Sequence, residues 1–330
     1  MASIYVLCPA NVKTGGTELL HQLVKELNHI GKNAYITYLE IPESGQVMNE
    51  AFSCYTDTYR TEADIEDCAE NVLVVPEIYC TVMERYRSIQ KYIWWLSVDN
   101  YLIHNSFADR KKLCGIKSAL KACIRGKLKD KTKLVQSANL HMCQSQYAIE
   151  YVKSIGIPES RIVYLSDYVN DVYLEHYESQ KRLKKEDVIL YNPKKGATFT
   201  KKLIAAAPEL NWVPLINMST EEVQQRMQTS KVYIDFGNHP GKDRFPREAA
   251  VSGCIVITGK RGAAKYYEDV RIPEKYKFDE DMATVSEITE RMKECLADYE
   301  VLNQDFAEYR EYILGEKTKF AQDVKMAFAR

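Results

Sequence analysis

The chain has 330 residues, a mass of 38.1 kDa, and 45 basic against 46 acidic side chains, which gives a net charge of −1. Hydrophobic residues make up 45% of it and charged residues 28%, a composition that excludes a disordered chain. The near-neutral charge argues against a protein that coats nucleic acid. At about 150 residues per domain, this length predicts two domains.

The termini and the cysteines indicate a cellular location. The N-terminus lacks the basic region and apolar run of a secretory signal, and no apolar stretch reaches the ~18 residues of a membrane span. The nine cysteines are scattered and never spaced as CxxC, a pattern typical of reduced thiols rather than of zinc ligands or disulfides. We therefore expect a cytoplasmic protein.

Short β-branched or aromatic segments alternate with longer helical patterns along the chain. Strands are predicted at residues 4–8, 34–39, 72–75, 92–96, 161–165, 188–191, 212–216, 232–236 and 254–258. Between the first two strands, apolar residues recur at helical spacing from Leu19 to Ile30, and residues from 279 onward are again helical in pattern. This alternation predicts an α/β fold with parallel sheets covered by helices on both faces.

Residues 166–186 separate two such series of strands and helices and end in a charged run. We therefore predict an N-terminal domain at 1–168, a linker at 169–186 and a C-terminal domain at 187–310. Residues 311–330 are predicted to form a C-terminal helix.

Two loops that follow predicted strands carry features of anion sites. Gly15 and Gly16 precede the first helix, where small residues and unpaired N–H groups can approach an anion or a sugar hydroxyl. An ordinary tight turn explains that pair equally well. Lys194 and Lys195, after Asn192, lie at the end of a strand, a place that suits a phosphate. Taken alone, the lysine pair fits a solvated basic loop better.

A third loop, at residues 236–250, is more informative. It leaves a strand through glycines and a proline, and it brings a histidine, cations and a carboxylate to one strand end before a short helix. These groups suit a nucleotide diphosphate, with the carboxylate binding ribose hydroxyls. The alternative is a surface helix on which Glu248 pairs with Arg244 at i, i+4.

This third region resembles the GT-B glycosyltransferases, particularly those related to family 4 (glycosyl transferases group 1). Residues 245–257, FPREAAVSGCIVI, resemble the family pattern EGFGLPxxEAxAxGxPVI, and Gly262-Ala263-Ala264 is similar to the small-residue loop that follows. Segments 143–162 and 217–223, the Lys195-Gly196 pair and the Gly15-Gly16 pair match further family segments in the same order. The resemblance covers nearly the whole chain.

The resemblance implies a GT-B fold: two Rossmann-like domains with parallel sheets facing across a cleft, and C-terminal helices of which the last packs back on the N-terminal domain. The C-terminal domain would hold a nucleotide-sugar and the N-terminal domain the acceptor. The implied donor-binding residues are Gly15, Gly16, Asn192, Lys194, Lys195, Met218, Ser219, Lys242, Arg244 and Glu248. Met218 and Ser219 would border the base, Lys195 and Arg244 the diphosphate, and Glu248 the ribose.

The resemblance also implies an activity, which is the transfer of a sugar from a nucleotide-sugar to a glycan, in surface polysaccharide or glycoconjugate synthesis. The implied catalytic residues are Asp99, His239 and Glu248, and the acceptor would lie near Asp99 and His104. A retaining mechanism is expected, with no metal and no other cofactor, because cations and helix N-termini take up the diphosphate charge.

The sequence departs from the family pattern in three places. Pro240 stands where the glutamate that partners Glu248 is expected, and Asn192 and Pro193 stand where an arginine normally precedes the phosphate lysine. Val98 replaces the histidine that commonly precedes Asp99. The missing glutamate and the missing histidine keep open an alternative, a non-catalytic GT-B module that binds a nucleotide or glycan and scaffolds an assembly complex. A nicotinamide-dependent oxidoreductase is a third hypothesis, which the absence of GxGxxG disfavours.

Residues 109–133 carry ten basic side chains against Asp109 and Asp130, a net of +8. Apolar residues at helical spacing give the segment a stripe: Leu113, Ile116, Leu120, Cys123, Ile124 and Leu128. A basic amphipathic helix suits an anionic membrane surface, with Lys117, Lys121 and Arg125 as contacts. Taken with the resemblance to GT-B glycosyltransferases, it implies a lipid-linked acceptor and a peripheral position on the inner membrane face. The alternatives are a solvated helix with its apolar side in the core, and nucleic acid, which the lack of a binding module disfavours.

Overall fold

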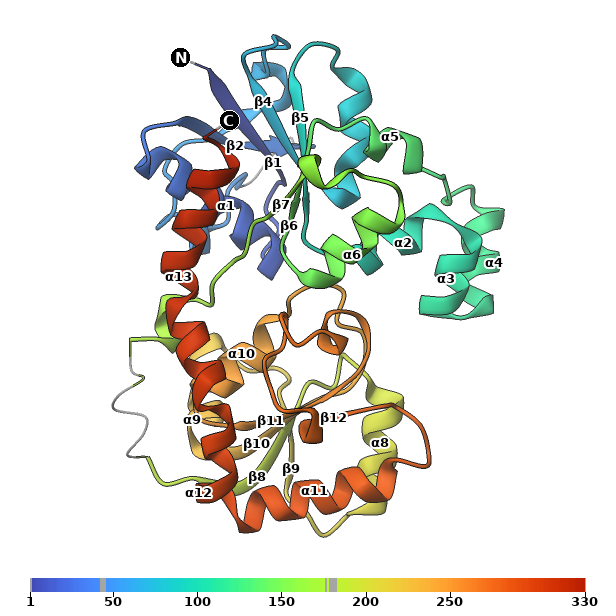
Figure 1. Cartoon of the computed structure of the whole chain (residues 1–330), viewed down its shortest axis with the longest axis vertical. Helices are drawn as coiled ribbons and strands as arrows, with labels where there is room; N and C mark the ends of the chain where they lie inside the picture. The colour runs from blue at the N-terminus through green and yellow to red at the C-terminus, as the bar shows by residue number, and fades with distance from the viewer. Residues whose placement is uncertain (1, 42–45, 176, 178–182, 330) are drawn as a thin grey trace. The chain divides into compact units, whose positions relative to one another are not determined.

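The computed structural model of the chain describes residues 2–41, 46–175, 177 and 183–329, and it divides into two compact units. One unit contains residues 1–167 and 319–330, and the other contains residues 168–318. Each unit is built on a parallel sheet flanked by helices (Figure 1). The predicted α/β class with two parallel sheets is confirmed.

The first unit holds a seven-stranded sheet in the order β3-β2-β1-β4-β5-β6-β7. Its strands are β1 (Ser3–Pro9), β2 (Asn33–Leu39), β3 (Arg60–Thr61), β4 (Val72–Pro76), β5 (Gln90–Trp95), β6 (Leu140–Cys143) and β7 (Ile162–Tyr164). All neighbouring strands pair in parallel, for example with Ile4 opposite Ala34 and Val72. The central strands β1, β4 and β6 are buried on both faces, and their sequences are almost continuously apolar.

The helices of the first unit lie between these strands. They are α1 (Gly15–His29), α2 (Val98–Asn105), α3 (Phe107–Cys114), α4 (Ile116–Ile124), α5 (Thr132–Gln136) and α6 (Gln146–Ser154), with 3-10 turns at Glu50–Phe52, Glu62–Asp64, Glu77–Arg85 and Glu159–Arg161. Thr14 caps α1, because its hydroxyl accepts a hydrogen bond from the Thr17 amide. In turn, the Thr17 hydroxyl accepts a hydrogen bond from the Thr14 amide.

The second unit holds a five-stranded parallel sheet in the order β12-β11-β10-β8-β9. Its strands are β8 (Glu186–Tyr191), β9 (Trp212–Pro214), β10 (Ser230–Asp235), β11 (Ile255–Gly259) and β12 (Lys277–Phe278). Its helices are α8 (Ala197–Ala206), α9 (Thr220–Thr229), α10 (Arg244–Val251), α11 (Val285–Ala297) and α12 (Tyr299–Leu302), with 3-10 turns at Asp171–Tyr173, Gly262–Lys265, Glu274–Tyr276 and Asn303–Phe306.

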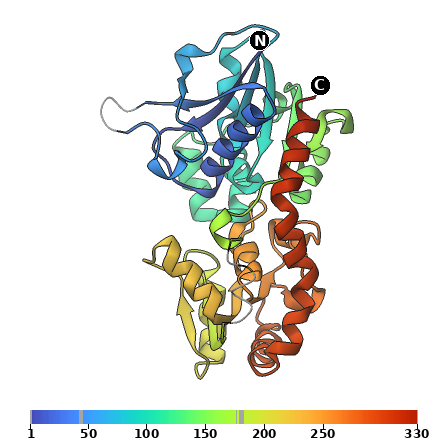
Figure 2. The ribbon, with the colours of Figure 1, turned by 90° about the vertical axis from the view of Figure 1, so that its left-hand side faces the viewer.

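The last helix, α13 (Ala307–Ala327), is one unbroken helix of 21 residues and is drawn in red in Figure 2. Its residues up to Thr318 belong to the second unit, and the rest belong to the first. In the first unit Phe320 stacks on Trp94 of β5, and Phe328 contacts Tyr92. The buried Asp323 accepts from the amide of Ser166 and pairs with Lys319.

The basic segment differs from the prediction of a single amphipathic helix. It forms two short helices, α3 and α4, because Gly115 adopts a φ of 81° between them. Gly126, with a φ of 60°, follows Arg125, the residue that caps the end of α4. A residue with a side chain adopts these angles only with strain, so each glycine interrupts the helix. Within the described residues, no helix combines the length and the hydrophobicity needed to cross a bilayer.

Candidate functional site

Three loops pack closely at the carboxyl edge of the sheet in the second unit. They follow β8, β10 and β11. Gly196, which precedes α8, has a φ of 57°, and a Cβ there would lie 1.5 Å from the carbonyl oxygen of Phe236. A Cβ on Gly262 would lie 2.1 Å from the carbonyl oxygen of His239, which accepts a hydrogen bond from the Ala263 amide at 2.8 Å. Glycine is therefore required at both contacts.

Lys195 brings a cation to this edge, immediately before α8. Its ammonium pairs with Asp243 and lies 3.8 Å from Oδ1 of Asp235, and the side chain is one quarter exposed. The first turn of α8 has no side-chain cap, because Gly196 occupies the capping position. A helix N-terminus with open amides next to a partly exposed lysine is a favourable place for an anion.

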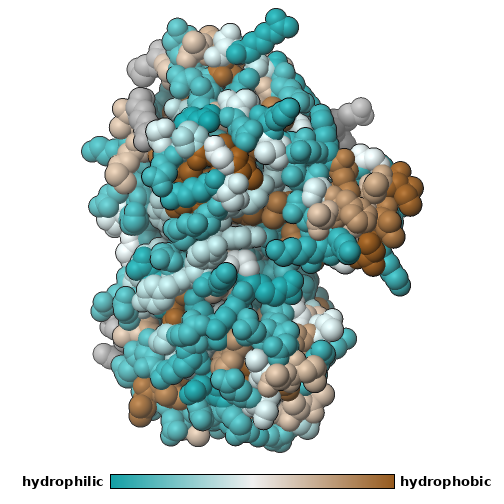
Figure 3. All heavy atoms as spheres, turned by 45° about the vertical axis from the view of Figure 1, so that its right-hand side comes forward, coloured by the Kyte–Doolittle hydropathy of each residue, from teal (hydrophilic) through white to brown (hydrophobic). Residues whose placement is uncertain are grey.

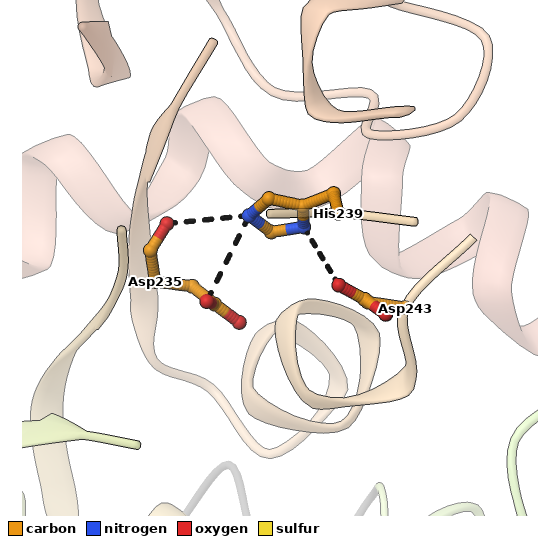
Figure 4. A group of neighbouring side chains, drawn as sticks. All are labelled: Asp235, His239 and Asp243. Carbon is orange, nitrogen blue, oxygen red and sulfur yellow. Dashed lines mark hydrogen bonds and ion pairs between the residues drawn. The ribbon is translucent and has the colours of Figure 1, made fainter. Parts of the chain in front are cut away.

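His239 lies between two carboxylates that flank it at i−4 and i+4 (Figure 4). Its Nδ1 is 3.0 Å from Oδ2 of Asp243, and its Nε2 is 3.7 Å from Oδ1 of Asp235 and 3.3 Å from the Asp235 carbonyl oxygen. Asp235 also accepts a hydrogen bond from the hydroxyl of Tyr233 at 2.9 Å. The imidazole is fully buried, so its neighbours are protein groups on both ring nitrogens.

The charges of this cluster are mutually stabilised. Burial opposes the charged form of His239, but Asp235 and Asp243 outweigh burial and raise the pKa of the imidazole. Burial likewise opposes ionisation of Asp243, and Lys195 and His239 together lower the pKa of that carboxyl. We infer a network of two carboxylates, one ammonium and one imidazolium, which is neutral as a whole.

Asp235, His239 and Asp243 also present ligand atoms within 4.8 Å of one another, a spacing that a metal ion could use. The ammonium of Lys195 already pairs with both carboxylates at this place. A divalent cation would have to displace that ammonium and a proton from His239. The donor set therefore fits an ion-pair network better than a metal site.

Glu248 lies on α10, one turn after Arg244. The Glu248 side chain is buried and accepts a hydrogen bond from Tyr173. Burial raises the pKa of the Tyr173 hydroxyl, and the Glu248 carboxylate raises it further, so the phenol stays a hydrogen-bond donor. The sequence suggested, as an alternative, a surface position for Glu248 in a pair with Arg244. Glu248 is buried instead, and the charges of Glu248 and Arg244 both act on the Tyr173 hydroxyl.

Lys242 and Arg247 are held by a carboxylate of α13. Both side chains are fully buried, and Glu316 pairs with Lys242 at 2.7 Å and with Arg247 at 2.8 Å. Lys242 also donates to the hydroxyl of Tyr312 at 3.0 Å, and Arg247 donates to the carbonyl oxygens of Lys242 and Asp243. The carboxylate thereby fixes the loop that leads into α10.

The remaining predicted donor residues lie on the loops after β8 and β9. Asn192 accepts from the Lys194 amide through its side chain at 3.0 Å, and Lys194 is exposed. Ser219 caps α9, because its hydroxyl accepts from the Glu222 amide and Glu222 accepts from the Ser219 amide. Met218 packs in part against the core of the unit.

The predicted residues of the first unit lie at the carboxyl edge of its own sheet. Gly15 and Gly16 form the first turn of α1, and a Cβ on Gly16 would lie 3.8 Å from Leu96, an ordinary contact. Asp99 is buried in the first turn of α2 and accepts from the Tyr147 hydroxyl at 2.7 Å. His104, at the end of α2, is largely exposed, and the partial burial of its ring, followed by the charge of Lys131, lowers its pKa.

Sequence reasoning did not identify several groups that hold these residues in place. Asp235, Asp243, Tyr173 and Glu316 were not singled out. The Asp235-x3-His239-x3-Asp243 spacing was visible in the sequence, but it lies in a loop that glycine and proline break, so no regular periodicity marked it. Glu316 lies 69 residues after Arg247, and only the fold brings them together.

Comparison with solved structures identifies the fold. No family model matches the chain, and no curated protein sequence matches it. Solved structures do match over the whole chain: HepE from Anabaena in complex with UDP-glucose (TM-score 0.62, 10% identity, 100% of each chain) and sucrose-phosphate synthase from Thermosynechococcus elongatus (0.63, 12%, 100% of each chain). The catalytic domain of starch synthase IV from Arabidopsis thaliana, bound to ADP and acarbose, matches at 0.60 and 10% identity over 100% of this chain and 99% of that one.

The chain has the GT-B fold. The predicted fold class is thereby confirmed, whereas no comparison tests the predicted site residues. In this GT-B chain, the carboxyl edge of the second sheet contains the Lys195, Arg244 and Glu248 side chains together with the open N-terminus of α8. That edge is the candidate functional site.

Proposed function

We propose that this chain is a glycosyltransferase that moves a sugar from a nucleotide-sugar donor to a glycan acceptor. The observation that carries the proposal is the position of Lys195 immediately before the uncapped N-terminus of α8, with its ammonium paired to Asp243 at the start of α10, the helix of Arg244 and Glu248. HepE, whose solved complex contains UDP-glucose, shares the fold over the full chain. The second unit would hold the donor.

Each proposed contact follows from charge and position. Lys195 and the first amides of α8 would bind the diphosphate, with Arg244, Lys194 and Asn192 at the edge of the same site. The buried Glu248, already an acceptor from Tyr173, would accept hydrogen bonds from the ribose hydroxyls. Met218 and Ser219, on the loop before α9, would border the base.

The structure supports a positioning role for His239 and Lys242. His239 is fully buried with a carboxylate at each ring nitrogen, so as an imidazolium it has no lone pair with which to accept a proton. Its charge would neutralise one of the two carboxylates that face Lys195, so that a single carboxylate, rather than two, would compete with a diphosphate for the ammonium. Lys242 is buried against Glu316 and would hold the loop rather than touch the donor.

The chemistry requires stabilisation of a leaving group. The acceptor oxygen bonds to the sugar C1 as the bond from C1 to the diphosphate oxygen breaks, and negative charge develops on the diphosphate. Lys195, Arg244 and the helix N-terminus supply preorganised positive charge there, so we propose a metal-independent transfer. Asp99 would take the proton of the acceptor hydroxyl. A retaining outcome rests on the family resemblance alone.

For the acceptor, we propose a lipid-linked glycan bound by the first unit near Asp99 and His104, in surface polysaccharide or glycoconjugate synthesis. The support is the basic segment with Lys117, Lys121 and Arg125 that follows His104 along the chain.

A thermal-shift panel of nucleoside diphosphates and nucleotide-sugars tests the donor site on wild type, Lys195→Ala and Glu248→Ala. A ligand at 100 times its dissociation constant adds ~2.7 kcal/mol to the free energy of unfolding. We expect one diphosphate family to stabilise the wild type, with the response lost in both variants and kept in the control Lys201→Ala, an exposed lysine of α8.

Incubation of the chain with each nucleotide-sugar that the panel identifies, followed by assay of the released nucleoside diphosphate, distinguishes the alternative function. A chain that binds a nucleotide but never hydrolyses or transfers the sugar of any donor would be a binding module that scaffolds an assembly complex. A wild type that responds to no nucleotide would overturn the donor site itself.

A further inference from the structure

The helical hairpin formed by α3 and α4 exposes the apolar stripe that the sequence predicted. Ile116, Leu120 and Ile124 lie on one face of α4, and they are 46%, 49% and 85% exposed. Phe107 of α3 is exposed as well. The helix buries its small residues instead, Ala119 and Ala122, so the alternative in which the large apolar residues face the core is wrong.

Apolar surface gathers over this hairpin at the right of Figure 3. Single exposed apolar residues are common on proteins, but a stripe of three large aliphatic side chains on consecutive turns of one helix is not explained by chance exposure. Exposed cysteines at positions 114 and 123 extend the same surface. Contact with an apolar partner would remove this surface from water and is therefore favourable.

Positive charge borders the stripe. Lys117, Lys121 and Arg125 are exposed one position after each of the three apolar residues and therefore form a parallel row on α4. Eight of the ten basic side chains of the segment are exposed: Lys111, Lys112, Lys117, Lys121, Arg125, Lys127, Lys129 and Lys133. The acidic Asp109 lies in the first turn of α3, and its carboxylate accepts a hydrogen bond from the hydroxyl of Ser106, which caps that helix. The surface is therefore both apolar and strongly basic.

Contacts at its base hold the hairpin in this orientation. The Arg110 guanidinium donates to the carbonyl oxygen of Ile103 at 2.8 Å and to the backbone and hydroxyl oxygens of Ser118 at 3.2 and 3.1 Å. Asn105, at the end of α2, accepts from the Lys131 amide at 2.9 Å, and the Lys131 ammonium lies over the Tyr101 ring. The apolar face is thus presented by a supported element.

We propose that the α3–α4 hairpin docks this chain on an anionic lipid bilayer, with Ile116, Leu120 and Ile124 inserted among the acyl chains and the lysines at the headgroups. A helix lying in the interface plane needs an apolar face and a basic flank, and α4 has both. Nucleic acid would meet the charge but leave the aliphatic stripe in water. An anionic bilayer can interact with both features, because its headgroups attract the basic side chains and its acyl chains accommodate the aliphatic ones. We therefore assign the bilayer as the partner of this surface.

The proposal deepens the proposed function, because it names the surface on which a lipid-linked acceptor would be met, but docking itself does not depend on sugar transfer. The test is co-sedimentation of the full chain with vesicles of phosphatidylcholine alone and with phosphatidylglycerol added to about one third of the lipid. We expect binding to the anionic vesicles only, weakened by salt.

Two variants separate the contributions. The triple change Lys117→Gln, Lys121→Gln, Arg125→Gln should weaken binding about a hundredfold, since each basic residue near an anionic surface contributes about a factor of five. Ile116→Ser, Leu120→Ser, Ile124→Ser should weaken it at least about tenfold and should lower stability only slightly, because about half or more of each side chain is already exposed. The matched charge control is Lys201→Gln, Lys202→Gln, Lys325→Gln, and the apolar control is Val301→Ser, 72% exposed.

Three outcomes would overturn the proposal. One is equal sedimentation of wild type and both triple variants. Another is the absence of vesicle binding together with retention of a single-stranded oligonucleotide that the charge variant loses. The third is a dimer in solution that Leu120→Ser converts to a monomer, which would assign the stripe to a second copy. Nucleotide-dependent thermal shifts of the hairpin variants, and vesicle binding by Lys195→Ala, keep failure of docking distinct from failure of the donor site.

Discussion

Nδ1 of His239 lies 3.0 Å from Oδ2 of Asp243, inside a cluster that also contains Asp235 and Lys195 and in which His239 and Asp235 are fully buried. Four charged groups in one small volume are tolerated because each is paired with a neighbour of opposite sign. The pairing joins three successive parts of the second unit: the loop after β8, the end of β10 and the start of α10. It therefore links the protonation of one histidine to the geometry of the candidate donor site.

Stability is expected to depend on pH through His239. The folded pKa of this imidazole is raised by Asp235 and Asp243 against the opposing effect of burial. Its contribution is therefore complete below the unfolded pKa of about 6.5 and is lost as pH rises through the higher folded pKa. Denaturant unfolding of wild type and His239→Asn between pH 5.5 and 9 should show a steeper loss of stability in the wild type. His29→Asn, an exposed histidine, is the control, and parallel curves for wild type and His239→Asn would contradict the assignment.

Replacement of Gly196 by alanine should destabilise the second unit and remove nucleotide binding. Its new Cβ would lie 1.5 Å from the carbonyl oxygen of Phe236, where backbone cannot easily move. Gly31→Ala is the matched control, because Gly31 also has a positive φ, 79°, but has open space around it. We expect about 1–2 kcal/mol for the control from backbone strain. The clash in Gly196→Ala should add about 1–3 kcal/mol. Equal losses in chemical denaturation would show that the loops can separate without cost.

Removal of the charge of Glu316 should be among the most damaging single changes in the second unit. Glu316→Gln leaves the buried Lys242 and Arg247 without a carboxylate, and loss of one partner of a buried ion pair costs about 3–5 kcal/mol. Lys317→Met, the next residue along α13, removes an exposed pair with Asp171 and should cost less than about 1 kcal/mol. Thermal unfolding of both variants gives the comparison. A small loss for Glu316→Gln would mean that water reaches the two cations.

The parallel sheets were predictable from the sequence because their central strands are continuous apolar runs. The nine predicted strands correspond to β1, β2, β4, β5, β7, β8, β9, β10 and β11. The strands that were not predicted, β3, β6 and β12, were missed for physical reasons. β3 and β12 contain two residues each, too few for a pattern, and His141 interrupts the hydrophobicity of β6. That histidine is buried, and its Nδ1 accepts from the Trp95 indole at 3.0 Å, a partner that only the sheet register reveals.

The candidate site was predictable only as far as short motifs extend. Lys195, Arg244 and Glu248 follow predicted strands, at or near the start of predicted helices, and this local order can be recognised from the sequence. Their partners come from elsewhere: Asp243 lies 48 residues from Lys195, and Tyr173 lies 75 positions before Glu248. The exposure of the α4 stripe could not be predicted either. Periodicity shows that a helix has an apolar face, but it does not show whether that face packs against the core or is exposed.

Glu77 provides a prediction for the first unit. This carboxyl is fully buried at the end of β4 and accepts from the Leu96 amide at 2.9 Å. Burial raises its pKa to about 7, although the amides of Leu96 and Ser97 and the charge of Lys131 oppose the shift. Because the folded pKa exceeds the unfolded value of 4.5, the stability that the neutral carboxyl contributes is full below that value and is lost as pH rises through about 7.

Glu77→Gln keeps an acceptor for the Leu96 amide and removes the titration. We expect the variant to match wild type near pH 5 and to exceed it by on the order of 3 kcal/mol near pH 8.5, since one pKa unit corresponds to about 1.4 kcal/mol. Urea unfolding at the two pH values provides the measurement, and Glu84→Gln, an exposed glutamate of the same 3-10 segment, is the control. If the glutamine variant were instead less stable at pH 8.5, the ionised carboxylate would be the form that the fold requires, and Glu77 would be a buried negative charge available to a ligand of the first unit.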